Sequence, residues 1–257
     1  MQIYVCVKHV PDTAATIRVI GGTGFDESVK FVMNPYDEYA VEQALRVRQQ
    51  QGTGEVVVVS VGKPAAMSAI RSALAVGADR GILVKTDRQF LDSAVTSQAL
   101  AKVIRQDGAP DLIFTGKQSV DTEGMQTHFR LAAALDLPVA TDVAAFTMTD
   151  GKVVVEREIG GGTRESIEMT LPCVVGATRG LNEPRYPKLS DIMKARKKQV
   201  REMDLEELGV QPAPSGAPEL VALEAAPERG EARMLLGTPR EMAEQLLEHL
   251  RNEAKVL

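Results

Sequence analysis

Short apolar runs rich in β-branched residues alternate with longer segments of helical periodicity over the first two-thirds of the chain. Four of these runs predict buried strands, at residues 3–10, 55–62, 80–85 and 111–116. Because a helix-length segment follows each run, the pattern is typical of βαβ units whose strands form a parallel sheet covered on both faces. The sequence therefore predicts an α/β fold built on a doubly wound, mostly parallel sheet.

The helices between these strands have recognisable ends. Asn34 is a favoured N-cap residue, Pro35 occupies the first helical position, and Gly52 is placed to end that helix. Further helices are expected at residues 64–77, 91–106 and 123–136.

After residue 140 the periodicity shortens to strand-like segments. Asp150-Gly151 predicts a hairpin turn and Gly160–Gly162 allows another reversal, so residues 140–177 predict an antiparallel extension of the sheet. A proline-bounded loop and a short basic helix follow. Residues 209–237 are rich in proline and glycine and predict a tether.

The chain ends in a predicted amphipathic helix. Thr238 and Glu241 match a capping box, and an apolar stripe follows that includes Leu246 and Leu250. This stripe needs a partner surface, either on the same domain or on another chain, and the pattern alone leaves both open.

Composition narrows the function classes. The net charge of −5, the absence of tryptophan and an aromatic content of 4% argue against nucleic-acid binding. No apolar run approaches the roughly 18 residues of a membrane helix, and no leader pattern is recognisable, so we expect no direct membrane insertion and a cytoplasmic location. Cys6 and Cys173 each lie within an apolar run, as core residues do, and the three histidines are too scattered for a metal site.

Common catalytic motifs are absent, so the candidate binding segments are the polar ones at the carboxyl ends of the predicted strands. The sequence contains no P-loop, no G-x-G-x-x-G after the first strand and no G-x-S-x-G. The richest of these segments is GKQSVDTEGMQT at residues 116–127, which precedes a helix whose N-terminus can receive a phosphate. An ordinary strand-to-helix loop explains it equally well.

Five segments together closely resemble the β subunits of electron transfer flavoproteins, at residues 33–48, 73–84, 116–127, 152–162 and 181–198. The likeness is collinear over residues 1–200, and LNEPRYPKLSDIMKARKK at 181–198 is its most specific part. The resemblance implies a Rossmann-like adenine-nucleotide-binding domain over residues 1–200, with a partner-recognition loop at 180–198. It also implies that residues 201–257 form an extended arm and a helix that packs on an α subunit.

The function implied by the resemblance is that of an electron-transfer carrier subunit without catalysis of its own. The α subunit carries the redox-active FAD, and this chain binds a structural AMP. Electrons pass from acyl-CoA or related flavin dehydrogenases, as in fatty acid β-oxidation, toward a membrane quinone oxidoreductase. No metal is expected.

The resemblance also implies the site residues by position. Those expected to contact AMP are Cys6, Asn34, Pro35, Tyr36, Asp37, Val61, Gly116, Gln118, Asp121, Gly124, Met125, Gln126 and Thr127. Those expected to dock dehydrogenases are Leu181, Asn182, Glu183, Pro184, Arg185 and Tyr186, with Leu181 as the anchor in a partner pocket. The basic residues that follow, Lys194 and Arg196 to Lys198, either steer an acidic partner or form a solvated face.

Two departures from the family pattern bear on the nucleotide. Pro11-Asp12-Thr13 stands where mitochondrial-type members carry Ile-Asp-Tyr, and is similar to anaerobe-type members. Some of those bifurcate electrons with NADH and bind a second FAD in place of AMP, which is the alternative function. Their Asp-Gly-Asp-Thr-Ala signature is absent, however, and Thr122 and Glu123 are expected to disfavour a second pyrophosphate. We therefore expect AMP. A stand-alone nucleotide-binding protein is a third possibility that the tether and terminal helix argue against.

Overall fold

A computed structural model describes residues 1–149, 151–210, 220–225 and 232–257. The chain divides into two compact units, Met1–Leu223 and Glu224–Leu257, each described by itself below.

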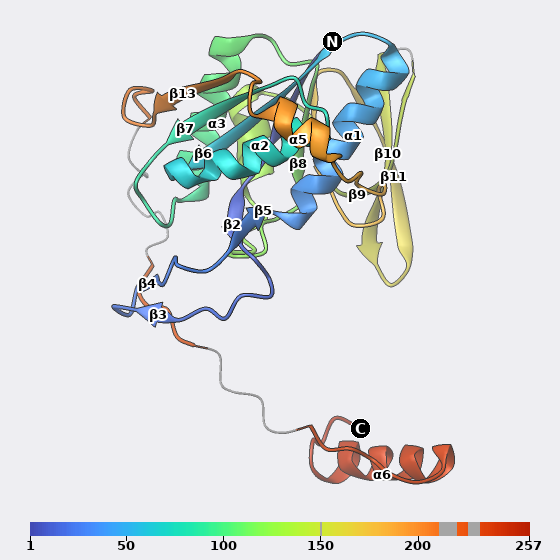
Figure 1. Ribbon diagram of the computed structural model, residues 1–257. Coiled ribbons are helices and arrows are strands. Elements are labelled where there is room, and N and C mark those ends of the chain that lie inside the picture. The colour runs from blue at the N-terminus through green and yellow to red at the C-terminus, as the bar shows by residue number, and fades with distance from the viewer. Residues whose placement is uncertain (150, 211–219, 226–231) are drawn as a thin grey trace. The chain divides into compact units, whose positions relative to one another are not determined.

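The first unit is built on a nine-stranded sheet with the strand order β11-β10-β9-β12-β8-β1-β6-β7-β13 (Figure 1). The strands from β13 through β9 in this order pair in parallel, and β10 and β11 add an antiparallel hairpin at one edge. Their bounds are β1 Gln2–Cys6, β6 Glu55–Gly62, β7 Arg80–Lys85, β8 Leu112–Gly116, β9 Val139–Thr149, β10 Lys152–Gly160, β11 Thr163–Thr170, β12 Cys173–Ala177 and β13 Val200–Asp204. The predicted doubly wound, mostly parallel α/β fold is confirmed.

Helices cover both faces of this sheet. On one face α1 (Pro35–Gln51) and α2 (Met67–Val76) share an apolar core with alternate residues of β1, Ile3 and Val5, and α5 (Leu189–Ala195) packs against α2. On the other face α3 (Ser93–Asp107) and α4 (Thr127–Leu135) share a second apolar core with the intervening residues, Tyr4 and Cys6. This alternation is the side-chain period of a strand buried on both faces.

Several element boundaries differ from the sequence-based prediction. The apolar run at 3–10 divides, because β1 ends at Cys6 and His9–Pro11 forms a separate strand, β2, that pairs with β5 (Phe31–Met33). A second small ribbon joins β3 (Val19–Ile20) and β4 (Gly24–Phe25). The helix expected from residue 64 begins as a 3-10 turn, Pro64–Ala66, before α2.

The helix expected at 123–136 begins only at Thr127, since Glu123 and Met125 adopt left-handed backbone conformations with φ of 48° and 51°. A right-handed helix cannot include such residues. Ten residues that follow β8 are therefore available as a loop.

Two predictions concern the edges of the first unit. The hairpin expected at Asp150-Gly151 is present between β9 and β10, although Asp150 itself lies outside the described residues. The boundary expected at residue 200 coincides with the first residue of β13, which pairs with β7, and the compact unit extends to Leu223.

The second unit contains α6 (Pro239–Asn252), which begins with the predicted capping box between Thr238 and Glu241. No residue of α6 is buried, and Leu246 and Leu247 are among its exposed apolar residues. Residues 211–219 and 226–231 of the predicted tether lie outside the described residues. The packing of this helix on an α subunit stays a prediction.

Candidate functional site

Successive strands are added to the sheet first on one side of β1 and then on the other. In open α/β sheets, the position at which the order changes sides is where ligands bind. From β1 the chain adds β6 and β7 on one side and then returns to place β8 on the other side. Loops at the carboxyl ends of β1 and β8 therefore diverge, and the region between them, called the crevice below, is where open α/β sheets bind their ligands. The two loops begin at Val7 and Lys117.

Asn34 and Asp37, at the beginning of α1, tie these two loops together. One oxygen of the Asp37 carboxylate accepts hydrogen bonds from Gly116 N at 3.0 Å and Asn34 Nδ2 at 2.9 Å, and the other accepts from Lys8 N at 2.7 Å. Asn34 Nδ2 also donates to Gln118 O at 2.9 Å, and Val120 N donates to Asn34 Oδ1 at 3.2 Å. Both side chains are buried. They act as internal clamps whose polar atoms are engaged within the protein.

This role corrects one prediction made from the sequence. Asn34 stands at the N-cap position of α1, but its side chain makes no capping hydrogen bond. Its amide is instead committed to Asp37 and to the loop after β8. Burial raises the pKa of Asp37 to about 7 despite the three N–H groups that donate to it.

A lysine from the loop after β1 holds the far part of the same crevice loop. Lys8 Nζ donates to Asp121 at 2.8 Å and to Ser119 Oγ at 3.3 Å. Neither Lys8 nor Ser119 was among the residues expected to contact the nucleotide, although Ser119 belongs to the segment 116–127 that the sequence indicated.

Beyond this lysine the loop is open to solvent. Residues 121–126 are all exposed, and two of them have the left-handed conformation described above. Gly124 has open space around it, so sterics do not require a glycine there. Gly116 does require one, because a Cβ there would lie 2.7 Å from Tyr36 Cβ. The close approach at Gly116 is thus that of α1.

The loop leads directly into α4, whose N-terminus faces the α3 side of the crevice. Gln126 is the N-cap residue and makes no side-chain cap, so the first-turn N–H groups lack that partner. Its Oε1 accepts from Ser93 Oγ at 3.3 Å and from Arg130 Nε at 3.1 Å. A phosphate group fits this arrangement because helix N-termini offer unpaired donors and a favourable dipole.

The other predicted nucleotide contacts divide between the two faces of the sheet. Cys6 is buried against the α3 and α4 core, and Val61 packs at the edge of the same core. Tyr36, in α1, is half-buried with Lys117 Nζ 5.5 Å from its ring centroid. Burial raises the pKa of the Cys6 thiol to about 12, so this cysteine is an inert neutral group at physiological pH.

His128, the second residue of α4, was not recognised as unusual from the sequence. It is 2% exposed, and its Nε2 has no hydrogen-bond partner among the described residues. Burial lowers its pKa to about 4, which keeps the ring neutral. No pattern in the sequence distinguishes it from an exposed histidine.

The predicted docking segment, residues 181–198 of the loop expected at 180–198, is joined to α1 by side-chain hydrogen bonds. Arg185 Nε donates to Glu42 Oε2 at 2.7 Å and its NH2 group donates to Oε1 at 3.0 Å. Asn182 Nδ2 donates to Tyr39 O at 3.0 Å and to Gln43 Oε1 at 3.2 Å.

The anchor role expected for Leu181 is not supported by its position. Leu181 is half-buried and packs against the core, so it presents less apolar surface to a partner than a fully exposed leucine does. The apolar side chains that do project from this segment are Tyr186, which is 95% exposed, and Leu189, which is 78% exposed.

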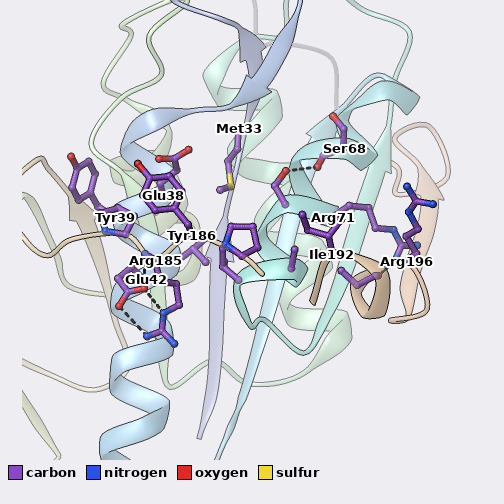
Figure 2. A pocket seen from close by; sticks show the side chains of 17 residues that line it. Met33, Glu38, Tyr39, Glu42, Ser68, Arg71, Arg185, Tyr186, Ile192 and Arg196 are labelled. Atoms are coloured by element: carbon purple, nitrogen blue, oxygen red, sulfur yellow. Dashed lines mark hydrogen bonds and ion pairs between the residues drawn. The ribbon is translucent and has the colours of Figure 1, made fainter. Parts of the chain in front are cut away.

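Beside the docking segment lies a cleft of about 680 Å³ (Figure 2). Its walls come from α1, α2, residues 184–187 and α5, and it is separate from the crevice described above. The lining includes Glu38, Tyr39, Arg71, Tyr186 and Arg196.

Two kinds of feature are absent from the described residues. They contain no group of three or more histidine, cysteine or carboxylate side chains arranged to hold a metal ion. They also contain no helix with the length and apolar character required to cross a bilayer.

Comparison with known proteins identifies the family. The family described as "Electron transfer flavoprotein domain" matches residues 23–208. The chain is 36% identical over 261 aligned residues to "Electron transfer flavoprotein subunit beta" of Bacillus subtilis, and 38% identical over 259 to the protein of that name from Bradyrhizobium diazoefficiens, with both chains covered completely. It is 40% identical over 222 residues to "Protein FixA" of Sinorhizobium fredii, covering 82% of this chain and 76% of that protein. The chain therefore belongs to the electron transfer flavoprotein family and groups with its β subunits.

Proposed function

We propose that this chain is the AMP-binding, non-catalytic subunit of a heterodimeric electron transfer flavoprotein whose redox-active FAD is held mainly by the α subunit. The observation that carries the proposal is the crevice loop, which is clamped by Asn34, Asp37 and Lys8 and leads into a helix N-terminus without a side-chain cap. Helix N-termini with unpaired N–H groups commonly bind phosphate, which supports the proposal.

The residues that would hold the nucleotide have distinct tasks. Backbone N–H groups around Gln126 and Thr127 would bind the phosphate, and Cys6 and Val61 would supply apolar surface. Asn34 and Asp37 would position the loop without touching the ligand. AMP, when bound there, would stabilise the folded chain through its binding energy and would supply no redox chemistry.

We also propose that the segment 181–198 docks acyl-CoA or related flavin dehydrogenases, from which electrons pass toward a membrane quinone oxidoreductase. Tyr186 and Leu189 suit this role because a rigid backbone presents their apolar surface to solvent at little entropic cost. Exposed basic residues nearby would speed the approach of an acidic partner. The cytoplasmic location stays a prediction.

A bifurcating protein with a second FAD and NADH remains the alternative function. From the sequence, Glu123 was expected to disfavour a second pyrophosphate. Glu123 is exposed, and solvent screens an exposed carboxylate from a pyrophosphate, so this objection to the alternative function is weaker than expected. The missing family signature at residues 121–125 still favours AMP.

Nucleotide counting distinguishes the two functions. The purified heterodimer is denatured in acid, and the released nucleotides are separated and quantified. We expect one FAD and one AMP per heterodimer. Two FAD, together with bleaching of flavin absorbance by NADH, would replace the proposed function by the bifurcating one.

A further inference from the structure

The cleft in Figure 2 has no task in the function proposed above. Its floor is apolar and its volume of about 680 Å³ lies within the range of ligand pockets. The side chains that form this floor are Met33, Val41, Ala75, Val76 and Ala195.

Most charged groups around the cleft are already engaged. Glu42 and Arg185 bind each other as described above, and Arg46 Nε also donates to Glu42 at 2.8 Å. One NH group of Arg71 donates to Ala195 O and Lys198 O, both at 2.7 Å, which fastens the end of α5 to α2. These groups hold the walls together.

Glu38 and Arg196 are the exceptions, and Figure 2 shows them on opposite sides of the cleft. Among the described residues, no side chain or backbone group donates a hydrogen bond to the Glu38 carboxylate. The surrounding side chains displace water from it and raise its pKa, although it stays accessible at the cleft wall. A carboxylate in this situation is stabilised by an incoming cation.

The cleft is continuous with the docking surface. Tyr186 belongs to the docking segment and also lines the cleft, as does Ile192 of α5, which is 39% exposed. From there Met193 and Leu189 extend the apolar surface outward. A protein that docks on this segment therefore covers the mouth of the cleft.

We propose that the cleft receives one basic side chain, a lysine or an arginine, of the protein that docks on residues 181–198. The aliphatic part of that side chain lies on the apolar floor, and its charged end binds Glu38. This inference rests on the docking role proposed above.

The charges around the cleft make such a contact depend on the orientation of the partner. Exposed lysines and arginines dominate the docking segment, so a complementary partner surface is mainly acidic there. A single cation opposite Glu38 is then repelled everywhere else on this surface. The pair would fix the orientation of the partner as well as add affinity.

Electron-transfer kinetics test the proposal on the complete heterodimer. The heterodimer serves as acceptor for an acyl-CoA dehydrogenase reduced by its acyl-CoA substrate, and KM and kcat are measured for the heterodimer. We expect Glu38→Gln to raise KM about threefold to fivefold and Glu38→Lys to raise it about tenfold or more, with kcat nearly unchanged. Glu183→Lys is the matched control, because Glu183 is an exposed acid of the docking segment that does not line the cleft.

The outcomes separate this inference from the docking proposal. Equal effects of Glu38→Lys and Glu183→Lys would show a general charge effect and overturn the cleft assignment, while a raised KM for Leu189→Ala would still support docking. Unchanged KM values for Leu189→Ala and both acidic variants would overturn docking on this segment, and the cleft inference with it. A wild-type heterodimer that accepts no electrons from the dehydrogenase would overturn both.

Discussion

Replacement of Asn34 by alanine tests whether the crevice loop is held by one buried amide. The side chain is 1% exposed and makes three hydrogen bonds, to Asp37, Gln118 O and Val120 N. Asn34→Ala removes all three and leaves the Gln118 carbonyl and the Val120 N–H without these partners. The loop after β8 then loses its connection to α1.

The magnitude follows from the kinds of bond that are lost. Two of them join uncharged groups and contribute about 1 kcal/mol each, and the bond to the Asp37 carboxylate contributes about 1.5–3 kcal/mol. We expect the free energy of unfolding to fall by about 3–5 kcal/mol. Because a domain has a total of roughly 5–15 kcal/mol, the variant should still fold.

The assay combines stability with nucleotide content. Urea unfolding of the full-length chain gives the free energy, and acid extraction of the heterodimer gives AMP per FAD, which we expect to fall well below one. Asn182→Ala is the matched control. The amide of Asn182 also donates to one backbone oxygen and one side-chain oxygen, but it lies in the docking segment and not in the crevice loop. We expect Asn182→Ala to retain its AMP.

One result would refute this reasoning. If Asn34→Ala loses less than about 1 kcal/mol and retains one AMP per heterodimer, the loop is held by other contacts. Equal loss of AMP in both asparagine variants would instead indicate a global effect of destabilisation.

Three further predictions concern packing, protonation and docking. Gly116→Ala places a Cβ 2.7 Å from an atom of α1 and should lower the free energy of unfolding in urea by about 1–3 kcal/mol. Gly124→Ala, in open space, should leave stability nearly unchanged, and equal effects of the two substitutions would contradict this account. The folded pKa of His128 is about 4 and its ordinary value is 6.5, so the unfolded chain binds the proton first, and stability should fall by up to about 3 kcal/mol as the pH falls from 6.5 to 4. His128→Gln should flatten that slope in unfolding measured across this window, and an unchanged slope would assign it to other groups. Leu181→Ala should lower stability without changing KM for a dehydrogenase, whereas Leu189→Ala should raise KM and leave stability nearly unchanged. A raised KM for Leu181→Ala with an unchanged KM for Leu189→Ala would identify Leu181 as the anchor.

Local signals in the sequence were sufficient for most of the fold. Continuous β-branched runs, Gly52 and the capping box at Thr238 act within a few residues, so β6, the end of α1 and the start of α6 could be predicted. The position of the crevice also followed, because alternating strands and helices restrict where a parallel sheet can bind a ligand.

The interactions that build the site connect distant residues and could not be predicted in this way. Asp37 bonds to Gly116, 79 residues away, and Glu42 to Arg185, 143 residues away, and neither pair leaves a periodic signal. The same limitation explains Leu181, because a leucine in a proline-bounded loop has the same local sequence whether it is buried or exposed.

By itself, the sequence determined the order and type of the main elements, since backbone conformation depends on short-range patterns. Only the tertiary structure decided which side chains are buried, which amides and carboxylates act as clamps, and which apolar residues face solvent. Those properties depend on what each side chain contacts after the sheet has brought remote segments together.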